Sequence, residues 1–230
     1  PVNWCVDCDT VLANEQVKNN RCWRCGLDVV QRDMAQWFLK MTDYSDELLD
    51  SLDEIEFPEN VKAMQRNWIG RSRGAEIKFK IEESGAEISC FTTRPDTIFG
   101  VTFLTLSPEH PLCEDLCRGT EWEEGWRNLR DECARLSEFE RINLLKEKKG
   151  VFLGQHAINP LSGDRIPVYA GNFVVAGYGT GAVMAVPGHD QRDFDFAKTY
   201  DLEIRRVLVE KPGDDPNHPL EQAFTDYGPM

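Results

Sequence analysis

Two pairs of cysteines near the N-terminus constrain the fold of this chain more than any other feature. Cys5 and Cys8 form one C-x2-C unit, and Cys22 and Cys25 form a second after thirteen intervening residues. Each unit directs two thiolates at one point, and two units complete a tetrahedral sulfur site. Four sulfur ligands leave no open coordination position, so we predict a structural Zn²⁺. A segment of about 30 residues buries little apolar core, and the metal would hold it folded.

Two other interpretations of these cysteines stay open: a redox dithiol, or four unrelated free thiols. A redox C-x-x-C is expected at a strand-to-helix junction of a βαβ unit, and neither pair is surrounded by such a pattern. The other four cysteines are scattered through the chain: Cys90, Cys113, Cys117 and Cys133. The uneven placement favours metal over a disulfide scaffold.

The composition is that of a folded, acidic protein. Apolar residues make up 41% of the 230 residues, which is enough for a real core. No apolar run is long enough to span a membrane and the N-terminus has no signal-peptide pattern, so we expect a cytoplasmic protein with no membrane partner. The net charge of −14 argues against non-specific nucleic-acid binding. A local pocket for one RNA end stays compatible with this charge, provided that basic surfaces elsewhere bring in the RNA.

A helical segment is predicted between the cysteine module and the rest of the chain. Residues 34–52 carry an amphipathic pattern at three- and four-residue spacing, formed by Trp37, Phe38, Met41, Tyr44, Leu48, Leu49 and Leu52. Residues 61–68 form a further short helix, and residues 70–74 a hinge. Basic residues gather here, and we favour ordinary surface over phosphate contacts for them: Lys62, Arg66, Arg71 and Arg73.

After Gly74 the sequence predicts strands. Polar and apolar residues alternate with period two over 75–81, and a partner strand begins at 87–91 after the turn at 83–86. Further strands are expected at 102–106, 151–154, 166–169, 173–175, 182–186 and 203–209, with a helix over 189–200. The stretch 108–149 is helical in character, with Leu112, Leu116, Trp122, Trp126, Leu129, Cys133, Leu136 and Phe139 as its buried stripe.

These patterns predict a fold of mixed α and β class. Many short strands interrupted by a helical insertion favour a closed or partly closed β-barrel with peripheral helices. The chain divides into a small zinc-binding module over 1–33, a helical connecting segment and hinge over 34–73, a strand-rich domain over 74–210 and a tail over 211–230. The tail is rich in Pro, Asp and Gly, so we expect it to be mobile.

The first candidate site is the segment 92–97, between two strands. It contains Thr92, Thr93, Arg94 and Thr97 together with Asp96 and a stiffening proline. Such a loop presents hydroxyls and backbone N–H groups, which a developing oxyanion requires. A plain turn capped by its own Arg and Asp explains the composition about equally well.

The second candidate site is the segment 177–193. Its glycines let the backbone approach a ligand closely, and an apolar strand with Met184 and Val186 can line a small pocket. His189, Asp190 and Asp193 follow at the start of a helix, where acids also stabilise the helix itself. Asp190 can therefore be a cap, and a single histidine is more often structural than catalytic.

The two segments together resemble a known family. TTRPDT followed far downstream by YGTGAVMAVPGHDQRD is similar to the editing domain of a bacterial-type leucyl-tRNA synthetase. The resemblance extends to the N-terminal cysteine module and to NWIGRS at 67–72, and so covers nearly the whole chain. HIGH-type and KMSKS-type activation motifs are missing, which indicates an excised insertion that ends in a truncated tail of the editing domain at 211–230.

The resemblance implies roles for individual residues. Asp193 would hold the α-ammonium of a misattached amino acid, and Thr97 would exclude the branched end of leucine. Thr92, Thr93 and Arg94 would orient the ester and the attacking water. Tyr178, Met184 and Val186 would wall the pocket for the side chain and adenosine, with His189 and Asp190 also in the substrate site.

The function implied by the resemblance is post-transfer editing. The 3′ end of tRNA(Leu) carrying norvaline, isoleucine or methionine would be the substrate, and the remainder of the synthetase would be a partner. One methylene or branch changes binding by only about 1–3 kcal/mol, so a second, hydrolytic sieve is required for accurate charging. The alternative hypothesis is a zinc-held RNA-binding or scaffolding module without catalysis.

Overall fold

The computed structural model describes residues 2–35, 37, 39–134, 136, 141, 147–177, 179–215, 218 and 220–230. The chain divides into two compact units, Pro1–Arg71 and Ser72–Met230. No helix among these described residues is long and apolar enough to cross a membrane.

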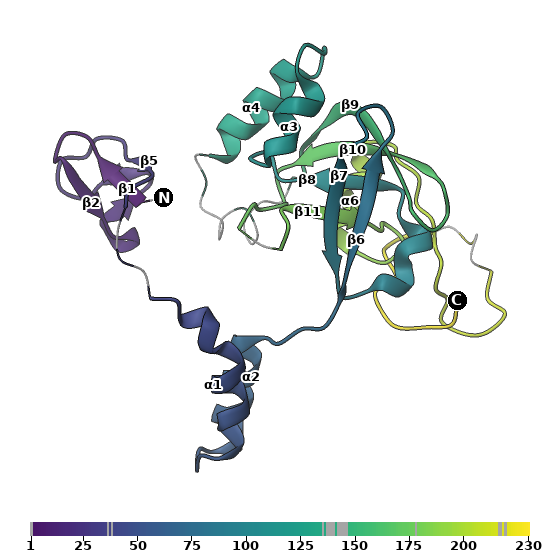
Figure 1. Cartoon of the computed structure of the whole chain (residues 1–230), viewed down its shortest axis with the longest axis horizontal. Helices are drawn as coiled ribbons and strands as arrows, with labels where there is room; N and C mark the ends of the chain where they lie inside the picture. The colour runs from purple at the N-terminus through teal and green to yellow at the C-terminus, as the bar shows by residue number, and fades with distance from the viewer. Residues whose placement is uncertain are drawn as a thin grey trace. The chain divides into compact units, whose positions relative to one another are not determined.

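The cysteine module is a small β structure within the first unit (Figure 1). Strands β2 (Thr10–Leu12), β1 (Val2–Cys5) and β5 (Val30–Arg32) form an antiparallel sheet in the order β2-β1-β5. A hairpin of β3 (Val17–Lys18) and β4 (Arg21–Cys22) turns through Asn19 and Asn20, both at positive φ, as tight hairpins require. The buried side chains of the module are Cys5, Leu12, Cys22 and Val29, so the two central cysteines form half of its core.

The connecting segment is helical over a shorter range than its periodicity predicts. A 3-10 turn, η2 (Met41–Tyr44), leads into α1 (Ser45–Asp50) and a second 3-10 turn, η3 (Ser51–Asp53). Most of the predicted apolar stripe is exposed, with Trp37 and Leu48 among the exposed side chains and Leu52 buried. The burial that the periodicity predicts is therefore wrong for most of this stripe. Phe38 lies outside the described residues.

The second predicted helix of this segment is confirmed as α2 (Glu59–Ile69). It ends at Gly70, whose φ of +66° gives the left-handed C-cap that glycine adopts most easily. Three of the four basic residues pair within the unit: Arg71 with Asp46 and Asp50, Arg66 with Asp53, and Lys62 with Glu59.

The second unit is built on one mixed six-stranded sheet in the order β11-β8-β10-β9-β6-β7 (Figure 1). All neighbouring pairs are antiparallel except β8 with β10. The strands are β6 (Ala75–Ile81), β7 (Glu87–Thr92), β8 (Phe103–Leu106), β9 (Gly150–Ile158), β10 (Arg165–Gly171) and β11 (Ala182–Ala185). The predicted hairpin of β6 and β7 is confirmed with Gly85 at positive φ in its turn.

The predicted closed barrel is not found in the described part of the chain. The edge strands β11 and β7 lie close to each other, yet no ladder joins them, so the sheet is curled but open. One physical reason lies directly after β11, where the N–H of Val186 donates to the Asp193 carboxylate instead of to a strand. The mixed α and β class of the prediction is confirmed, with the open sheet as its correction.

The predicted helical insertion contains α3 (Pro111–Cys117) and α4 (Glu123–Cys133). Both helices pack against β9, side by side (Figure 1). Leu116, Trp126, Leu129 and Cys133 are buried as predicted, whereas Trp122 stays 37% exposed. Phe139 lies outside the described residues.

Two predicted strands are wrong. Residues 173–175 and 203–209 lie in no strand, and their backbone groups have other partners. Arg141 donates to the carbonyls of Asn172 and Val174, and His189 accepts from the N–H groups of Val207 and Leu208. Hydrogen bonds to side chains thus take the place of the strand-to-strand hydrogen bonds that these apolar segments predict.

Candidate functional site

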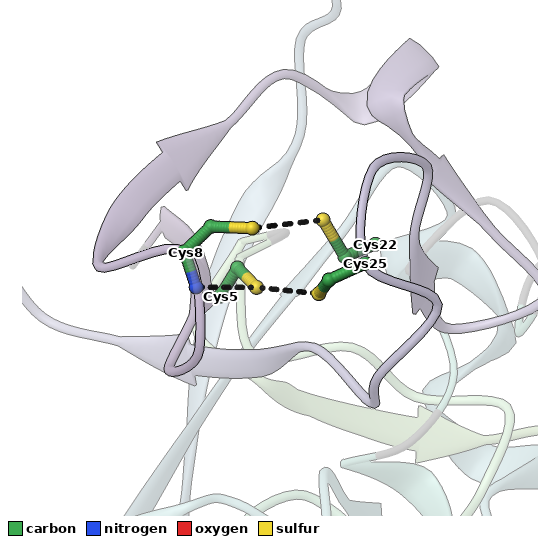
Figure 2. A group of neighbouring side chains, drawn as sticks. All are labelled: Cys5, Cys8, Cys22 and Cys25. Carbon is green, nitrogen blue, oxygen red and sulfur yellow. Dashed lines mark hydrogen bonds between the residues drawn. The ribbon is translucent and has the colours of Figure 1, made fainter.

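The four N-terminal cysteines converge on one point. Figure 2 shows the pair Cys5 and Cys8 facing the pair Cys22 and Cys25, and all four sulfurs lie within 4.8 Å of one another. Two of the sulfur–sulfur distances are 3.4 Å (Cys5–Cys25) and 4.0 Å (Cys8–Cys22). Tetrahedral Zn–S bonds of about 2.3 Å require sulfurs about 3.8 Å apart, so the donor set and spacing fit a closed structural zinc site.

The pKa values of two of these thiols, Cys8 and Cys22, are strongly shifted from their ordinary values. A hydrogen bond with Cys25 raises the pKa of Cys8 to about 12, and the backbone N–H of Cys25 lowers the pKa of Cys22 to about 7. Four sulfurs packed together compete for protons, and a cation removes that competition by binding thiolates. Among the described residues no other group of three or more His, Cys, Asp or Glu side chains converges in this way.

The threonine-rich segment forms a tight turn between β7 and the 3-10 helix η4 (Pro95–Gly100). The Thr92 hydroxyl accepts from the N–H of Arg94 at 3.0 Å, and the Thr97 hydroxyl donates to the Arg94 carbonyl at 2.9 Å. Thr97 is only 2% exposed, whereas Thr93 is exposed. The hydroxyls of Thr92 and Thr97 therefore hold the turn.

Arg94 lies at the centre of a polar network. Its guanidinium donates to the Asp96 carboxylate at 3.0–3.2 Å and to the Thr225 carbonyl at 3.3 Å, and it stacks 4.2 Å from the centre of the Tyr227 ring. The hydrogen bond from Arg94 holds the pKa of Asp96 below its ordinary value. The guanidinium plane is thus fixed on two edges and one face.

The apolar strand β11 brings the second motif against the first. Met184 and Val186 are each 5% exposed and share a core cluster with Ile98 of η4. A Cβ atom on Gly100 would lie 3.1 Å from Val186, so glycine permits this close approach. The second predicted segment therefore packs against η4, the 3-10 helix that begins within the first segment.

Two glycines at the entry to β11 lie in the left-handed region of backbone conformation. Gly179 and Gly181 have φ of +61° and +70°, which other residues rarely adopt. Gly181 accepts from the N–H of Ser107 at 2.8 Å. Tyr178 lies outside the described residues.

His189 and Asp190 hold local structure. The Asp190 carboxylate caps α6 (Gln191–Thr199) by accepting from the N–H groups of Arg192 and Asp193. His189 is 7% exposed and uses both ring nitrogens, one at 2.9 Å from the Phe224 carbonyl and the other accepting from Val207 and Leu208. Burial lowers the pKa of His189, and an acceptor Nε2 with a donor Nδ1 is the neutral ring.

Asp193 is a buried carboxylate on the first turn of α6. It is 4% exposed, and its Oδ2 accepts from the N–H of Val186 at 2.8 Å. Burial, assisted by the nearby charge of Asp190, raises the pKa of Asp193 to about 8. No Lys, Arg or His side chain of the described chain lies within 4.0 Å of it as an ion-pair partner. The charge of Arg192 acts on Asp193 from a longer distance and lowers its pKa, but the effect of burial is larger.

Residues 223–227 belong to the site, although their composition predicts a mobile tail. The N–H groups of Ala223 and Phe224 donate to the Gln191 side chain and the Gly188 carbonyl, and Thr225 and Tyr227 contact Arg94. These contacts are long-range and follow no periodicity. The only sequence signal is a pair of aromatic residues in a Pro- and Gly-rich stretch.

A cavity of about 430 Å³ lies beside the turn, not between the two motifs. Its lining includes Phe99, Arg206, Val207, Pro212 and Met230 and none of the predicted pocket residues that the structure describes. Since Thr97, Met184, Val186 and Asp193 are all buried, the predicted site is closely packed in this structure.

Comparison with known proteins identifies the family. Residues 66–230 match the family described as leucyl-tRNA synthetase, editing domain. The leucine–tRNA ligase of Rubrobacter xylanophilus is 53% identical, with 100% of this chain and 28% of the relative covered, and that of Thermotoga petrophila is 51% identical with the same coverage. A crystal structure of the ternary complex of Agrobacterium radiobacter LeuRS with tRNA and LeuAMS is 40% identical with a TM-score of 0.69, covering 94% of this chain and 26% of that chain.

These matches agree with the geometry. The chain spans about a quarter of the length of the relatives it matches. The matched region includes the threonine turn, β11 and the start of α6, which are the elements that the structure brings together. This chain belongs to the leucyl-tRNA synthetase family, in which it corresponds to the editing domain with its preceding four-cysteine module.

Proposed function

We propose that this chain carries out post-transfer editing, the hydrolysis of the aminoacyl ester of mischarged tRNA(Leu). Water attacks the carbonyl carbon, and the bond from that carbon to the ribose oxygen breaks. One water proton goes to the ribose oxygen, and the products are the free amino acid and an uncharged tRNA 3′ end. Norvaline, isoleucine and methionine are the proposed misattached amino acids. The remainder of the synthetase and the tRNA are the proposed partners.

The observation that carries this proposal is the environment of Asp193. A buried carboxylate with a raised pKa and no ion-pair partner among the described residues gains most from binding a positive group. The α-ammonium is the one cation that every aminoacyl ester offers. Asp193 would therefore hold any misattached amino acid through a charge-assisted hydrogen bond from its α-ammonium group.

We assign the selection between amino-acid side chains to the residues that line the proposed pocket beside Asp193. Thr97 is fixed by its bond to the Arg94 carbonyl, so its methyl group has one position. A fixed methyl group can exclude the branched end of leucine while admitting a straight side chain. Met184, Val186 and Tyr178 are the proposed remaining walls.

The reacting ester is assigned to the threonine turn. Thr93 is exposed there and Arg94 is oriented by its neighbours, so a hydroxyl and a guanidinium are available to position the ester and the water. Thr92 supports them by bonding to the N–H of Arg94. His189 and Asp190 contribute by fixing the start of α6, which carries Asp193.

The test is deacylation of norvalyl-tRNA(Leu) by the chain and by its Asp193→Asn variant. We expect the variant to lose roughly 10- to 150-fold in kcat/KM, the value of a hydrogen bond to a charged group. We expect Asp193→Ala to lose at least as much. Asp195→Asn is the matched control, because Asp195 lies on the exposed face of the same helix.

Equal turnover by the Asp193 variants and the wild type would refute the anchor. Binding of tRNA without any hydrolysis would favour the non-catalytic RNA-binding module. The same substitutions in a full-length synthetase provide the reference, since the relatives extend well beyond this chain.

A further inference from the structure

Residues 223–227, which we call the strap, cross both motif segments. On the α6 side the N–H of Phe224 donates to the Gly188 carbonyl at 2.9 Å, and the N–H of Ala223 donates to the Gln191 side chain at 3.1 Å. On the side of the threonine turn the Thr225 carbonyl accepts from Arg94. One short stretch is thus bonded to two elements far apart in sequence.

The His189 side chain links the strap to two other segments of the second unit. Its neutral ring donates from Nδ1 to the Phe224 carbonyl at 2.9 Å. The same ring accepts at Nε2 from the N–H of Val207 at 3.0 Å and that of Leu208 at 3.2 Å. A single buried side chain therefore joins the strap, the 207–208 segment and the turn before α6.

The strap ends on the guanidinium of Arg94. Asp96 occupies the Nε and Nη2 edge, the Thr225 carbonyl occupies Nη1, and the Tyr227 ring covers the face at 4.2 Å. Arginine presents its donors in one rigid plane, so contacts on the edges and the face determine where that plane lies. Without the strap, Asp96 alone would leave the guanidinium free to rotate about the shared edge.

Burial does not explain the place of Tyr227. The residue is 80% exposed, so packing of its ring removes little apolar surface from water. The contact with a cation is the specific interaction that the ring makes, and such contacts are directional.

We propose that the strap is a positioning element of the editing site, in which Tyr227 and the Thr225 carbonyl fix the Arg94 guanidinium and His189 holds the strap in place. The inference rests on the proposed function of Arg94 in orienting the ester. In this proposal, His189 and Tyr227 do not contact the substrate. They affect the reaction only by fixing the position of Arg94.

The first experiment compares Tyr227→Ala with Tyr227→Phe in deacylation of norvalyl-tRNA(Leu). We expect Tyr227→Ala to lower kcat by roughly 2- to 30-fold, the range of a cation–π contact, with little change in KM. Tyr227→Phe keeps the ring and restores the wild-type kcat. The high exposure of Tyr227 makes both variants compatible with folding. Equal kcat values for Tyr227→Ala and Tyr227→Phe would overturn the proposal.

The second experiment separates the two bonds of His189. In His189→Gln the amide oxygen can replace the Nε2 acceptor, but the donor to Phe224 is lost. In His189→Asn the amide nitrogen can replace the Nδ1 donor, but the acceptor for Val207 and Leu208 is lost. We expect His189→Gln to lower kcat as Tyr227→Ala does, and the double variant to lose no more than either alone. Hydrogen exchange at the Phe224 amide should accelerate in His189→Gln and stay slow in His189→Asn.

The outcomes distinguish this inference from the proposed function. If the wild-type chain and the full-length enzyme fail to deacylate, the proposed function is wrong. If both deacylate and the losses of His189→Gln and Tyr227→Ala simply add, His189 does not act through the contact of Tyr227 with Arg94 and the inference is wrong.

Discussion

In the proposed editing site, Thr97 contributes shape to recognition and Asp193 contributes charge. Thr97 is held in one rotamer by a hydroxyl bond to a backbone carbonyl, and Asp193 is held by a backbone N–H. Both side chains are nearly inaccessible, so neither is free to adapt to a ligand. A site built this way discriminates by fixed dimensions.

Two substitutions at Thr97 separate its size from its hydroxyl. Thr97→Ala removes both branches, so we expect leucyl-tRNA(Leu) to become a substrate. Thr97→Val keeps the volume, and we expect leucine to remain excluded. The Arg94 carbonyl stays partnered in both variants, because the N–H of Thr97 also donates to it at 3.1 Å. Hydrolysis of leucyl-tRNA(Leu) by each variant is the measurement, and continued protection of that ester in Thr97→Ala would rule out steric exclusion.

Residue roles are predictable from the sequence where local chemistry suffices. The cap by Asp190 follows from its place before a helix, and the convergence of the four cysteines follows from their spacing. The linking role of His189 is not predictable, because its hydrogen-bond partners lie eighteen and more residues away in segments without a sequence pattern. Such roles depend on tertiary contacts that no local spacing encodes.

Helices and strands, too, are predictable from the sequence only where a local signal specifies them. The hairpin of β6 and β7 and the helix α2 are predictable because period two and the glycine C-cap are local signals. Residues 203–209 have the composition of a strand, but the N–H groups of Val207 and Leu208 bond to an imidazole. The apolar stripe of 34–52 predicts a buried face, yet Met41 and Leu48 are exposed in this chain.

Metal removal tests the cysteine module as an element. The module has four buried core residues, half of them cysteines, so we expect bound Zn²⁺ to contribute most of its stability. We expect chelation of the zinc-loaded protein to collapse the NMR amide signals of 2–32, while those of 75–92 and 182–199 persist. Adding Zn²⁺ back should restore the lost signals. Simultaneous loss of both sets would contradict the separation of the metal from the editing site.

The whole molecule is acidic and covers only part of its relatives. The net charge is −14, and Lys62, Arg66 and Arg71 are paired with acids inside the first unit. Phosphate binding needs clustered, available cations, so we expect most affinity for tRNA to come from outside this chain. What the chain contributes is the curled sheet that brings 92–97 and 186–193 together and the strap that crosses them.

The most direct test of this account is an NMR titration of the Asp193 carboxyl carbon, with and without a non-hydrolysable norvalyl-adenosine analogue. In the free chain we predict a pKa of about 8, because burial disfavours the charged form of the carboxyl group and no ion pair offsets that effect. Binding of the analogue places an ammonium there, and the pKa should fall by about 1 to 3. A pKa that is unchanged or raised in the complex, with undiminished affinity of Asp193→Asn for the analogue, would contradict the central claim.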